Sequence, residues 1–517
     1  MKKLFLLTLV IGSISAISTH TALATNGMNM IGYGARMAGM AGASFGISGD
    51  TNLMNPNPAG ITTIPGRRVD GGIGLLFPAV KFKNGLNDLD ANSAVFPLPS
   101  IGFVSNNSDS PWSFGVGMYA QGGMGATYDG VSHSLFKTYD NTPLTTDSYV
   151  GQEYHSNIAY MKLAPTVAYE LLPNLSAGVS LNLGYAMMEM KMPYSMSPSA
   201  MQGQIPGMNG MTFGQMFGSP MDQGGLGYDE VTALADMSDG VTATGYGFKL
   251  GMQYQPVEKL TFGFSYTNKA TLDFSGDAEM DMTSQFGDAY DKMVMGALVQ
   301  GAANPMNPTS AELNAAHQGV GVQLAGMGID MSKGMAAIYD VDIEFSWPQE
   351  FGFGAAYVAP DRLTVAADVR WINWKDSMEK FVMKLSGGAN PNINAMMGTQ
   401  NGNMQIEMPL NWDDQIVLAI GAEYLATDVF AIRAGFNIGN NPVPAETVIP
   451  IFPAIVENHI TLGAGYKISD NVSIDAAYEL VVSNSLDVNK SIIANEYDGS
   501  TSQLGENILH VSVGYEF

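Results

Sequence analysis

Residues 175–185 read Leu-Ser-Ala-Gly-Val-Ser-Leu-Asn-Leu-Gly-Tyr, with apolar side chains at the odd positions and small or polar ones between them. A period of two is typical of a β-strand that has one apolar and one polar face. The same alternation recurs in other stretches, namely 341–357, 363–371, 430–438, 472–480 and 509–517. The sequence therefore predicts an all-β chain.

The composition excludes several classes of function. The chain has 517 residues, a formal net charge of −25 and only 23 Lys and Arg. Such an acidic chain cannot neutralise phosphates, so we expect no nucleic-acid partner. It has no Cys, which rules out disulfides, thiolate metal sites and cysteine nucleophiles. We expect no metal, no cofactor and no catalytic residues.

The N-terminus has the pattern of an export signal. Lys2 and Lys3 precede a mostly apolar run, and Ala22-Leu23-Ala24 provides a cleavage site. This pattern predicts a signal peptide over 1–24, with an N-terminal membrane anchor as the alternative. After residue 24 no run approaches 18 apolar residues, so we expect no membrane-spanning helix. The exported protein is then either soluble or a β-barrel.

Three features favour a membrane barrel over a soluble sandwich. Short and long connections between the predicted strands alternate, as in outer-membrane barrels. Aromatic residues near strand ends suit the membrane interface, and they include Trp347, Tyr357, Trp371, Trp374, Trp412, Tyr424 and Tyr466. The last segment alternates up to a terminal Phe517, which resembles the signal read by barrel-assembly machinery. The apolar faces would then meet lipid and the polar faces the bore.

The segments that alternate number fourteen, which predicts a 14-stranded antiparallel transmembrane β-barrel over 67–517 with long, partly helical extracellular loops. The predicted strands are 67–82, 97–106, 111–124, 156–170, 175–192, 241–255, 260–274, 341–358, 362–376, 404–424, 428–439, 457–468, 471–488 and 506–517.

Residues 25–66 do not follow the strand pattern. They are rich in small residues and end in Asn55-Pro56-Asn57-Pro58-Ala59-Gly60. One interpretation is a flexible leader; the other is a plug, or hatch, folded inside the bore, where polar side chains satisfy an irregular backbone. Charged residues at polar-face positions are suited to hold such a plug, namely Lys249, Asp368, Arg370, Arg433, Asp475 and Glu479.

The sequence resembles the FadL/TodX family of outer-membrane transporters of long-chain fatty acids and hydrocarbons. The resemblance rests on Gly32–Gly39, the triplet Asn57, Pro58 and Ala59, Pro111–Gly115, Trp374, Pro442–Ala445, Ile460–Tyr466 and Phe517. It implies a fourteen-stranded barrel with an N-terminal hatch at 25–66, in the outer membrane beside lipid and lipopolysaccharide. It also implies a kink in the third strand that opens the wall sideways, which we place at Gly122, Gly123 and Gly125.

Two predicted loops are rich in methionine, a flexible and polarizable residue that suits varied apolar ligands. A groove for such ligands is predicted at Met208, Met211, Phe213, Met216, Phe217, Met293 and Met295. The alternative is that these residues pack the loops together. Thr309 and Glu312 form a capping-box pattern, which predicts a helix within the second loop.

The resemblance also implies basic residues for a fatty-acid carboxylate, and Lys191 and Lys380 are our candidates; solvated lysines at the rim are the alternative. If neither of these two lysines points inward, a neutral hydrocarbon substrate is favoured. A general porin and an outer-membrane hydrolase are the rivals. The hydrolase is disfavoured because only six His are present and none forms a recognisable nucleophile–base pattern.

Overall fold

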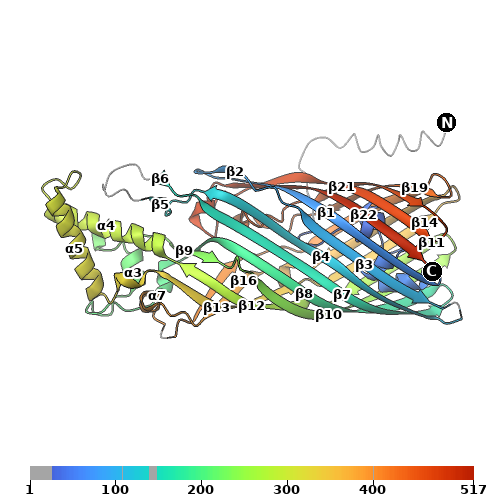
Figure 1. Ribbon diagram of the computed structural model, residues 1–517, viewed down its shortest axis with the longest axis horizontal. Helices are drawn as coiled ribbons and strands as arrows, with labels where there is room; N and C mark the ends of the chain where they lie inside the picture. Colours follow the sequence, from blue (N-terminus) through green and yellow to red (C-terminus); the bar gives the residue numbers. More distant parts are fainter. Residues whose placement is uncertain (1–25, 108, 139–147, 400) are drawn as a thin grey trace.

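The computed structural model describes residues 26–107, 109–138, 148–399 and 401–517. They form a closed barrel (Figure 1), and the predicted signal peptide lies outside this described part. Strands pair antiparallel around the ring, and β1 (Arg67–Lys83) pairs with β22 (Thr501–Glu516) to close it. A closed ring leaves no free sheet edge facing lipid.

The main sheet contains 20 strands. Besides β1 and β22 these are β2 (Asp88–Asp90), β3 (Phe96–Asn106), β4 (Trp112–Val131), β7 (Gln152–Leu172), β8 (Leu175–Met196), β9 (Val231–Asp236), β10 (Val241–Val257), β11 (Leu260–Thr267), β12 (Ala270–Asp281), β13 (Ala336–Trp347), β14 (Glu350–Val358), β15 (Leu363–Ile372), β16 (Lys380–Ser386), β17 (Met404–Pro409), β18 (Gln415–Leu425), β19 (Phe430–Gly439), β20 (Asn458–Lys467) and β21 (Val472–Asp487). A separate pair is formed by β5 (Lys137–Thr138) and β6 (Ser148–Tyr149).

The predicted number of fourteen strands is therefore wrong. Three predicted strands are each divided in two, giving β11 with β12, β13 with β14, and β17 with β18. The division between β13 and β14 falls at Pro348, which has no N–H to donate to a ladder. Short strands β2, β9 and β16 also form inside predicted loops. Alternation shows where a strand lies but not where its ladder is interrupted.

The predicted orientation of the strands is confirmed. On β8, Val179 and Leu181 face outward and are 45% and 47% exposed, whereas the residues that follow each of them, Ser180 and Asn182, are buried. The same alternation shows that the interface prediction was wrong for Trp347, Trp374 and Trp412, which are all buried. These three lie where a ladder is interrupted, so their proximity to strand ends does not place them at the membrane surface.

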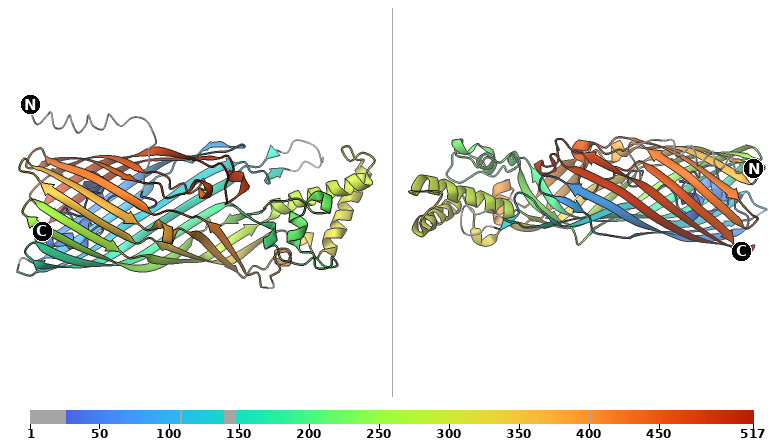
Figure 2. Two further views of the ribbon diagram at one scale, coloured as in Figure 1. Left: turned by 180° about the vertical axis from the view of Figure 1, so that it is seen from behind. Right: turned by 90° about the horizontal axis from the view of Figure 1, so that it is seen from above.

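The two ends of the barrel differ. Short turns and the C-terminus lie at one end, and the long connections lie at the other (Figure 1). The long connections carry α3 (Phe213–Gly218), α4 (Thr283–Gly301), α5 (Ser310–Gly326) and α7 (Pro391–Met397), and α4 and α5 project beyond the barrel (Figure 2). Thr309 and Glu312 form the predicted capping box at the start of α5. No helix in the described residues is both long and apolar enough to cross a membrane.

Residues 26–66, called the inner segment below, lie inside the barrel near the end with the short turns (Figure 1). They contain α2 (Gly34–Ala38) and the 3-10 helices η1 (Thr51–Met54) and η2 (Pro58–Thr63). Helix α2 contacts β20, β21 and β22, while η2 contacts β7, β8 and β10. The segment therefore touches opposite sides of the wall. The remaining short helices belong to the connections between strands and are η3 (Pro198–Ala200), η4 (Met221–Gln223), η5 (Met331–Lys333), α6 (Trp374–Ser377), η6 (Ala445–Thr447) and η7 (Asn495–Tyr497).

Candidate functional site

Charged side chains of the wall hold the body of the inner segment. The Asp368 carboxylate accepts hydrogen bonds from the backbone N–H groups of Ser44 at 2.6 Å and Phe45 at 3.1 Å. Arg370 donates through Nη2 to the carbonyl of Gly42 at 2.7 Å. Hydrogen bonds to charged groups are worth about 1.5–3 kcal/mol each. The prediction that Asp368 and Arg370 face the bore is thus confirmed.

The triplet Asn57, Pro58 and Ala59 shapes η2. The Asn57 side-chain oxygen caps the helix by accepting from the Ala59 N–H at 3.2 Å, and Pro58 occupies the first turn. The Asn57 side-chain N–H₂ donates to the carbonyl of Met252 on β10 at 3.1 Å. A Cβ at Gly251 of the same strand would lie 2.1 Å from the Asn57 oxygen, so the glycine permits this close approach.

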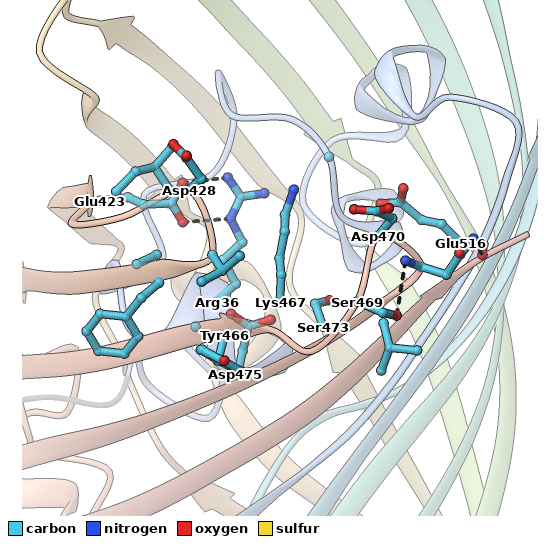
Figure 3. Close-up of a pocket in the computed structure, with 18 of the residues that line it drawn as sticks. Arg36, Glu423, Asp428, Tyr466, Lys467, Ser469, Asp470, Ser473, Asp475 and Glu516 are labelled. Atoms are coloured by element: carbon cyan, nitrogen blue, oxygen red, sulfur yellow. Dashed lines mark hydrogen bonds and ion pairs between the residues drawn. The ribbon is translucent and has the colours of Figure 1, made fainter.

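At the end with the short turns, a polar cavity of about 330 Å³ lies beneath the inner segment (Figure 3). Arg36 of α2 contacts Glu423 of β18 at this cavity, with Nη2 2.9 Å from Oε1. Glu423 also accepts from Arg433 Nε at 2.6 Å, and Arg433 pairs with Asp475 at 2.6 Å. The network ties α2 to three strands of the wall.

The first residues of the inner segment, 26–30, are attached more weakly. We call them the N-terminal piece. Asn29 forms an isolated bridge with Gly122, and the Met30 N–H reaches the Gln121 carbonyl at 3.4 Å. Trp347 donates from Nε1 to the Asn29 side-chain oxygen at 2.7 Å. No charged side chain of the described residues contributes to these attachments.

The N-terminal piece covers an interruption in the wall. The β3–β4 ladder ends at Ser100 and Tyr119, and the β4–β7 register shifts between Ala120 and Gly122. A Cβ at Gly122 would lie 2.0 Å from the Met28 carbonyl oxygen, so this contact requires glycine. The predicted glycine cluster, with Gly123 and Gly125, therefore does coincide with a β-bulge and a gap in the β3–β4 ladder.

Beside the bulge lies a small cavity of about 20 Å³, called the lysine pocket below. Lys162 of β7 and Lys249 of β10 line it and are each only 4% exposed. Neither forms an ion pair or hydrogen bond within the described part of the chain. Buried charge is costly unless it is paired. The lining also includes Glu350, Asn29 and Gln121, so the pocket adjoins both the N-terminal piece and the bulge.

A row of aromatic rings leads away from the lysine pocket. Tyr160 lies 4.7 Å from Trp347, Trp347 6.1 Å from Trp374, and Trp374 5.4 Å from Trp412, measured between ring centroids. Phe452 stacks on Trp412 at 6.1 Å. Aromatic pairs at such separations attract each other and present a large apolar surface. The buried bore is thus apolar along this row and has two lysines at its inner end.

The methionine-rich loops form a large apolar cluster at the opposite end. Among the predicted groove residues, Phe213, Met216 and Phe217 are buried, whereas Met211, Met293 and Met295 are partly buried against the cluster and Met208 is exposed. The three buried residues pack the loop core, as the alternative interpretation expected. The other four remain accessible for an apolar ligand.

A family model covers nearly the whole chain. Residues 11–517 match the family described as outer membrane protein transport protein (OMPP1/FadL/TodX). The chain belongs to this family. It is therefore an outer-membrane transport protein, and the family consists of transport channels rather than enzymes.

Solved structures share the fold. A Pseudomonas aeruginosa FadL homologue superimposes with a TM-score of 0.64 at 19% identity, over 95% of this chain and 99% of that one. The Pseudomonas putida toluene transporter TodX gives 0.65 at 17% identity, over 95% and 100%. The Ralstonia pickettii toluene transporter TbuX gives 0.61 at 18% identity, over 94% and 99%. A comparison with curated protein sequences finds no match.

The two lysines inferred from the family resemblance do not face the bore, which corrects that prediction. Lys191 lies on the outward side of β8, opposite buried Met190 and Met192, and pairs with Asp236 at 2.6 Å. Lys380 is half-exposed and pairs with Glu407 at 2.7 Å. The positive charge of each lysine is therefore already neutralised by a carboxylate on the neighbouring strand.

Sequence reasoning placed Lys249 in the bore but missed Lys162. A signal was present, because Lys162 shares the parity of Tyr160 and Ala164, whereas Leu163 belongs to the outward face. Its ladder partners are Tyr119 and Gly184, neither of which is acidic. An inward lysine without a cross-strand carboxylate is the pattern that distinguishes it from Lys191 and Lys380.

Proposed function

We propose that this transporter takes up long-chain fatty acids or similar hydrophobic carboxylates. The observation that carries the proposal is the pair of buried lysines, Lys162 and Lys249, at the inner end of an apolar bore, where Glu350 is the one carboxylate of the described lining and forms no ion pair with either. A ligand carboxylate adds a second acceptor for these two side chains. Burying its hydrocarbon chain contributes about 0.8 kcal/mol per methylene, so a long chain needs few other polar contacts.

The proposed route begins in the loops and ends at the wall. The accessible methionines capture the ligand, and the aromatic row leads it to the lysine pocket. The inner segment acts as a hatch, of which the N-terminal piece moves because its attachments are few and uncharged. The ligand then leaves sideways past Gly122, Gly123 and Gly125, where β4 lacks β3 as a partner. Passage is diffusive and needs no cofactor or catalytic residue.

Neutral aromatic or aliphatic hydrocarbons are the second candidate. The aromatic row favours them, since flat rings pack well between Trp and Tyr side chains. Structural relatives described as toluene transporters agree with this alternative. A general porin is less well supported, because the inner segment occupies the bore.

Uptake of a radiolabelled C18 fatty acid and of radiolabelled toluene by cells that produce the protein tests the proposal. Replacing Lys162 and Lys249 by Met should weaken fatty-acid binding about 10- to 100-fold, the equivalent of one charged hydrogen bond of about 1.5–3 kcal/mol. Toluene uptake should not change. Binding of the same fatty acid to the purified protein should weaken in parallel with uptake.

Lys191→Met and Lys380→Met are the matched controls, since these lysines lie outside the bore. If the inward and outward variants behave alike, the lysine pocket does not bind the carboxylate. If toluene is taken up and the fatty acid is not, the hydrocarbon alternative replaces the first proposal.

Barrel-assembly machinery and outer-membrane lipids are the other proposed partners, inferred from the surfaces that the barrel exposes. Phe517 is exposed at the end of β22, where its N–H donates to the Arg67 carbonyl at 3.0 Å. This accessible C-terminal ring is available to barrel-assembly machinery. Outer-membrane lipid and lipopolysaccharide would contact the outward apolar faces and the loops above them. Deleting Phe517 should slow assembly into the membrane without altering the transport of the protein that does assemble.

A further inference from the structure

The connection between β19 and β20 folds into the bore instead of over the surface. We call residues 441–456 the strap. Most of its side chains are buried in the same apolar cluster as the bore, including Val443, Val448, Ile449, Ile451, Ala454, Ile455 and Val456. Connections normally run over the surface, where water satisfies their backbone. A connection that is buried inside the bore therefore occupies space through which a transported ligand must pass.

The beginning of the strap is held firmly near its own strands. The Asp413 N–H donates to the Pro442 carbonyl at 2.8 Å, and the Thr447 hydroxyl donates to the Leu410 carbonyl at 2.6 Å. On its other side, the Ile492 N–H donates to the Glu446 carbonyl at 3.0 Å. These bonds fix residues 442–447 to two neighbouring loops.

The tip of the strap, residues 449–453, reaches the far side of the bore. Its contacts with that wall are two hydroxyl donors, Tyr128 of β4 to the Pro450 carbonyl at 3.4 Å and Ser156 of β7 to the Ile451 carbonyl. The strap begins beside the junction of β17 and β18, and its tip touches β4 and β7. Around the ring, the strands β19 to β22, β1 and β3 lie between these two places on one side, and strands from β8 to β15 lie between them on the other. The strap therefore spans the bore.

The composition of the tip keeps its attachment weak. Pro450 and Pro453 have no N–H, and the Phe452 N–H is used locally on the Ile449 carbonyl at 3.1 Å. The tip thus donates no backbone hydrogen bond to the wall in the described part of the chain. Two neutral hydrogen bonds from the wall contribute about 1 kcal/mol each, and the rest of the attachment is the burial of apolar side chains such as Ile449 and Ile451, which an apolar ligand can replace.

The tip also lies between the loops and the lysine pocket. Ser156 pairs with Ala126, a few residues beyond the Gln121 bulge toward the loop end. Phe452 stacks on Trp412, at the outer end of the aromatic row whose inner end is Trp347 in the pocket lining. A ligand that follows this row from the loops meets the strap first and the N-terminal piece second.

We propose that the strap is a gate within the bore, additional to the hatch, whose tip leaves Tyr128 and Ser156 to admit an apolar ligand to the aromatic row. The proposal rests on the uptake function above. It divides the path into two barriers in series, with the strap controlling entry to the lysine pocket and the hatch controlling exit. Phe452 and Ile451 are then the side chains that a ligand must displace.

Reversible cross-linking tests the gate, and the absence of Cys from the chain makes the chemistry selective. The variant Ile451→Cys with Ser156→Cys is treated with a short bifunctional methanethiosulfonate, and uptake of a radiolabelled C18 fatty acid is measured before and after reduction. We expect cross-linking to lower uptake at least tenfold and reduction to restore it. Each single-Cys variant, treated in the same way, controls for the bulk of the reagent.

A matched pair at the base, Thr447→Cys with Leu410→Cys, should cross-link without loss of uptake, because this part of the strap is already fixed. Unchanged uptake with a cross-linked tip would overturn the gate, as would failure of the tip pair to cross-link in protein whose heat-modifiable gel mobility shows a folded barrel. If the protein without substitutions takes up no fatty acid, the proposed function fails instead. The two failures are therefore distinguishable.

Discussion

Arg36 and Glu423 form a two-pronged ion pair, with Nε 3.0 Å from Oε2 and Nη2 2.9 Å from Oε1. This pair joins α2 of the inner segment directly to a wall strand at the end with the short turns. Two parallel bonds of this kind fix position as well as supplying energy. The charge of Glu423 is further shared with Arg433, so the pair belongs to a network and not to a single contact.

Replacing Arg36 by Ala should loosen the inner segment. The variant leaves Glu423 with only one of its two guanidinium partners, and we expect a loss of about 1–3 kcal/mol in the attachment of α2, below the cost of a fully orphaned buried charge. Planar-bilayer recordings should then show more frequent ion-conducting events. Protease cleavage within the inner segment should also become faster.

Lys83→Ala is the control for that experiment. Lys83 pairs with Asp88 at the opposite end of the barrel, and both side chains are exposed, so the pair contributes little. Its conductance should match that of the unchanged protein. If Arg36→Ala also shows no increase in ion-conducting events, the ion pair does not hold the inner segment in place.

Replacing Gly122 by Ala should displace the N-terminal piece. The added Cβ would lie 2.0 Å from the Met28 carbonyl oxygen, which is far inside van der Waals contact. Because the N-terminal piece has few attachments, we expect it to move instead of the β4–β7 ladder. Hydrogen exchange at the amides of 28–30 should speed up, while exchange in β7 stays unchanged.

Gly71→Ala provides a comparison within the same barrel. Gly71 lies on β1 with no heavy atom within 4 Å of the position of its Cβ. This variant should exchange like the unchanged protein. Faster exchange in β7 of the Gly122 variant would show that the wall, not the N-terminal piece, absorbs the clash.

The loop between β21 and β22 should respond to pH in two opposite ways. Burial raises the pKa of Glu496 from 4.5 to about 7, and burial lowers the pKa of His133 from 6.5 to about 4. The stability due to neutral Glu496 is complete below pH 4.5 and is lost as the pH rises through about 7. The stability due to neutral His133 is complete above pH 6.5 and is lost as the pH falls through about 4.

Amides of 488–500 should therefore be best protected between about pH 4.5 and 6.5, after correction for intrinsic exchange rates. Glu496→Gln keeps a neutral side chain at every pH and should remove the loss on the alkaline side alone. His133 Nε2 lies 3.6 Å from Glu496 Oε2, so its acid-side loss should persist in the variant. A Glu496→Gln protein that still loses protection above pH 7 would assign the effect to another group.

Strand alternation alone was sufficient to predict the β class, the outward apolar faces and the end at which the long loops lie. Val179, Leu181 and their inward neighbours behave as the period of two requires. The number of strands was not predictable in this way, because β11 to β18 keep their alternation on both sides of each break. Pro348, and Pro409 at the end of β17, gave the local signs of an interruption.

The site was predicted less completely, since a pocket depends on which strands face each other. Alternation places Lys249 in the bore, but only the closed ring brings it to the same cavity as Lys162 and Trp347. Likewise Trp374 and Trp412 lie near predicted strand ends, as interface residues do. Only the structure shows that the chain leaves the ladder at these positions and that both side chains are buried. The strap was not predicted for the same reason, because the apolar run over 448–456 indicates burial but not that these residues cross the bore.

Replacing Trp347 by Phe tests how the lysine pocket is coupled to the hatch. Phe keeps most of the ring volume between Tyr160 and Trp374 but removes the hydrogen bond from Nε1 to the Asn29 oxygen at 2.7 Å. Loss of about 1 kcal/mol should raise the open population of the N-terminal piece roughly fivefold. Hydrogen exchange at 28–30 should speed up by that factor relative to 44–53, which charged wall residues hold. Trp412→Phe alters a ring of the same row but leaves the Asn29 bond intact, so its exchange should not change; equal acceleration in both variants would mean that packing along the row, and not this bond, holds the N-terminal piece.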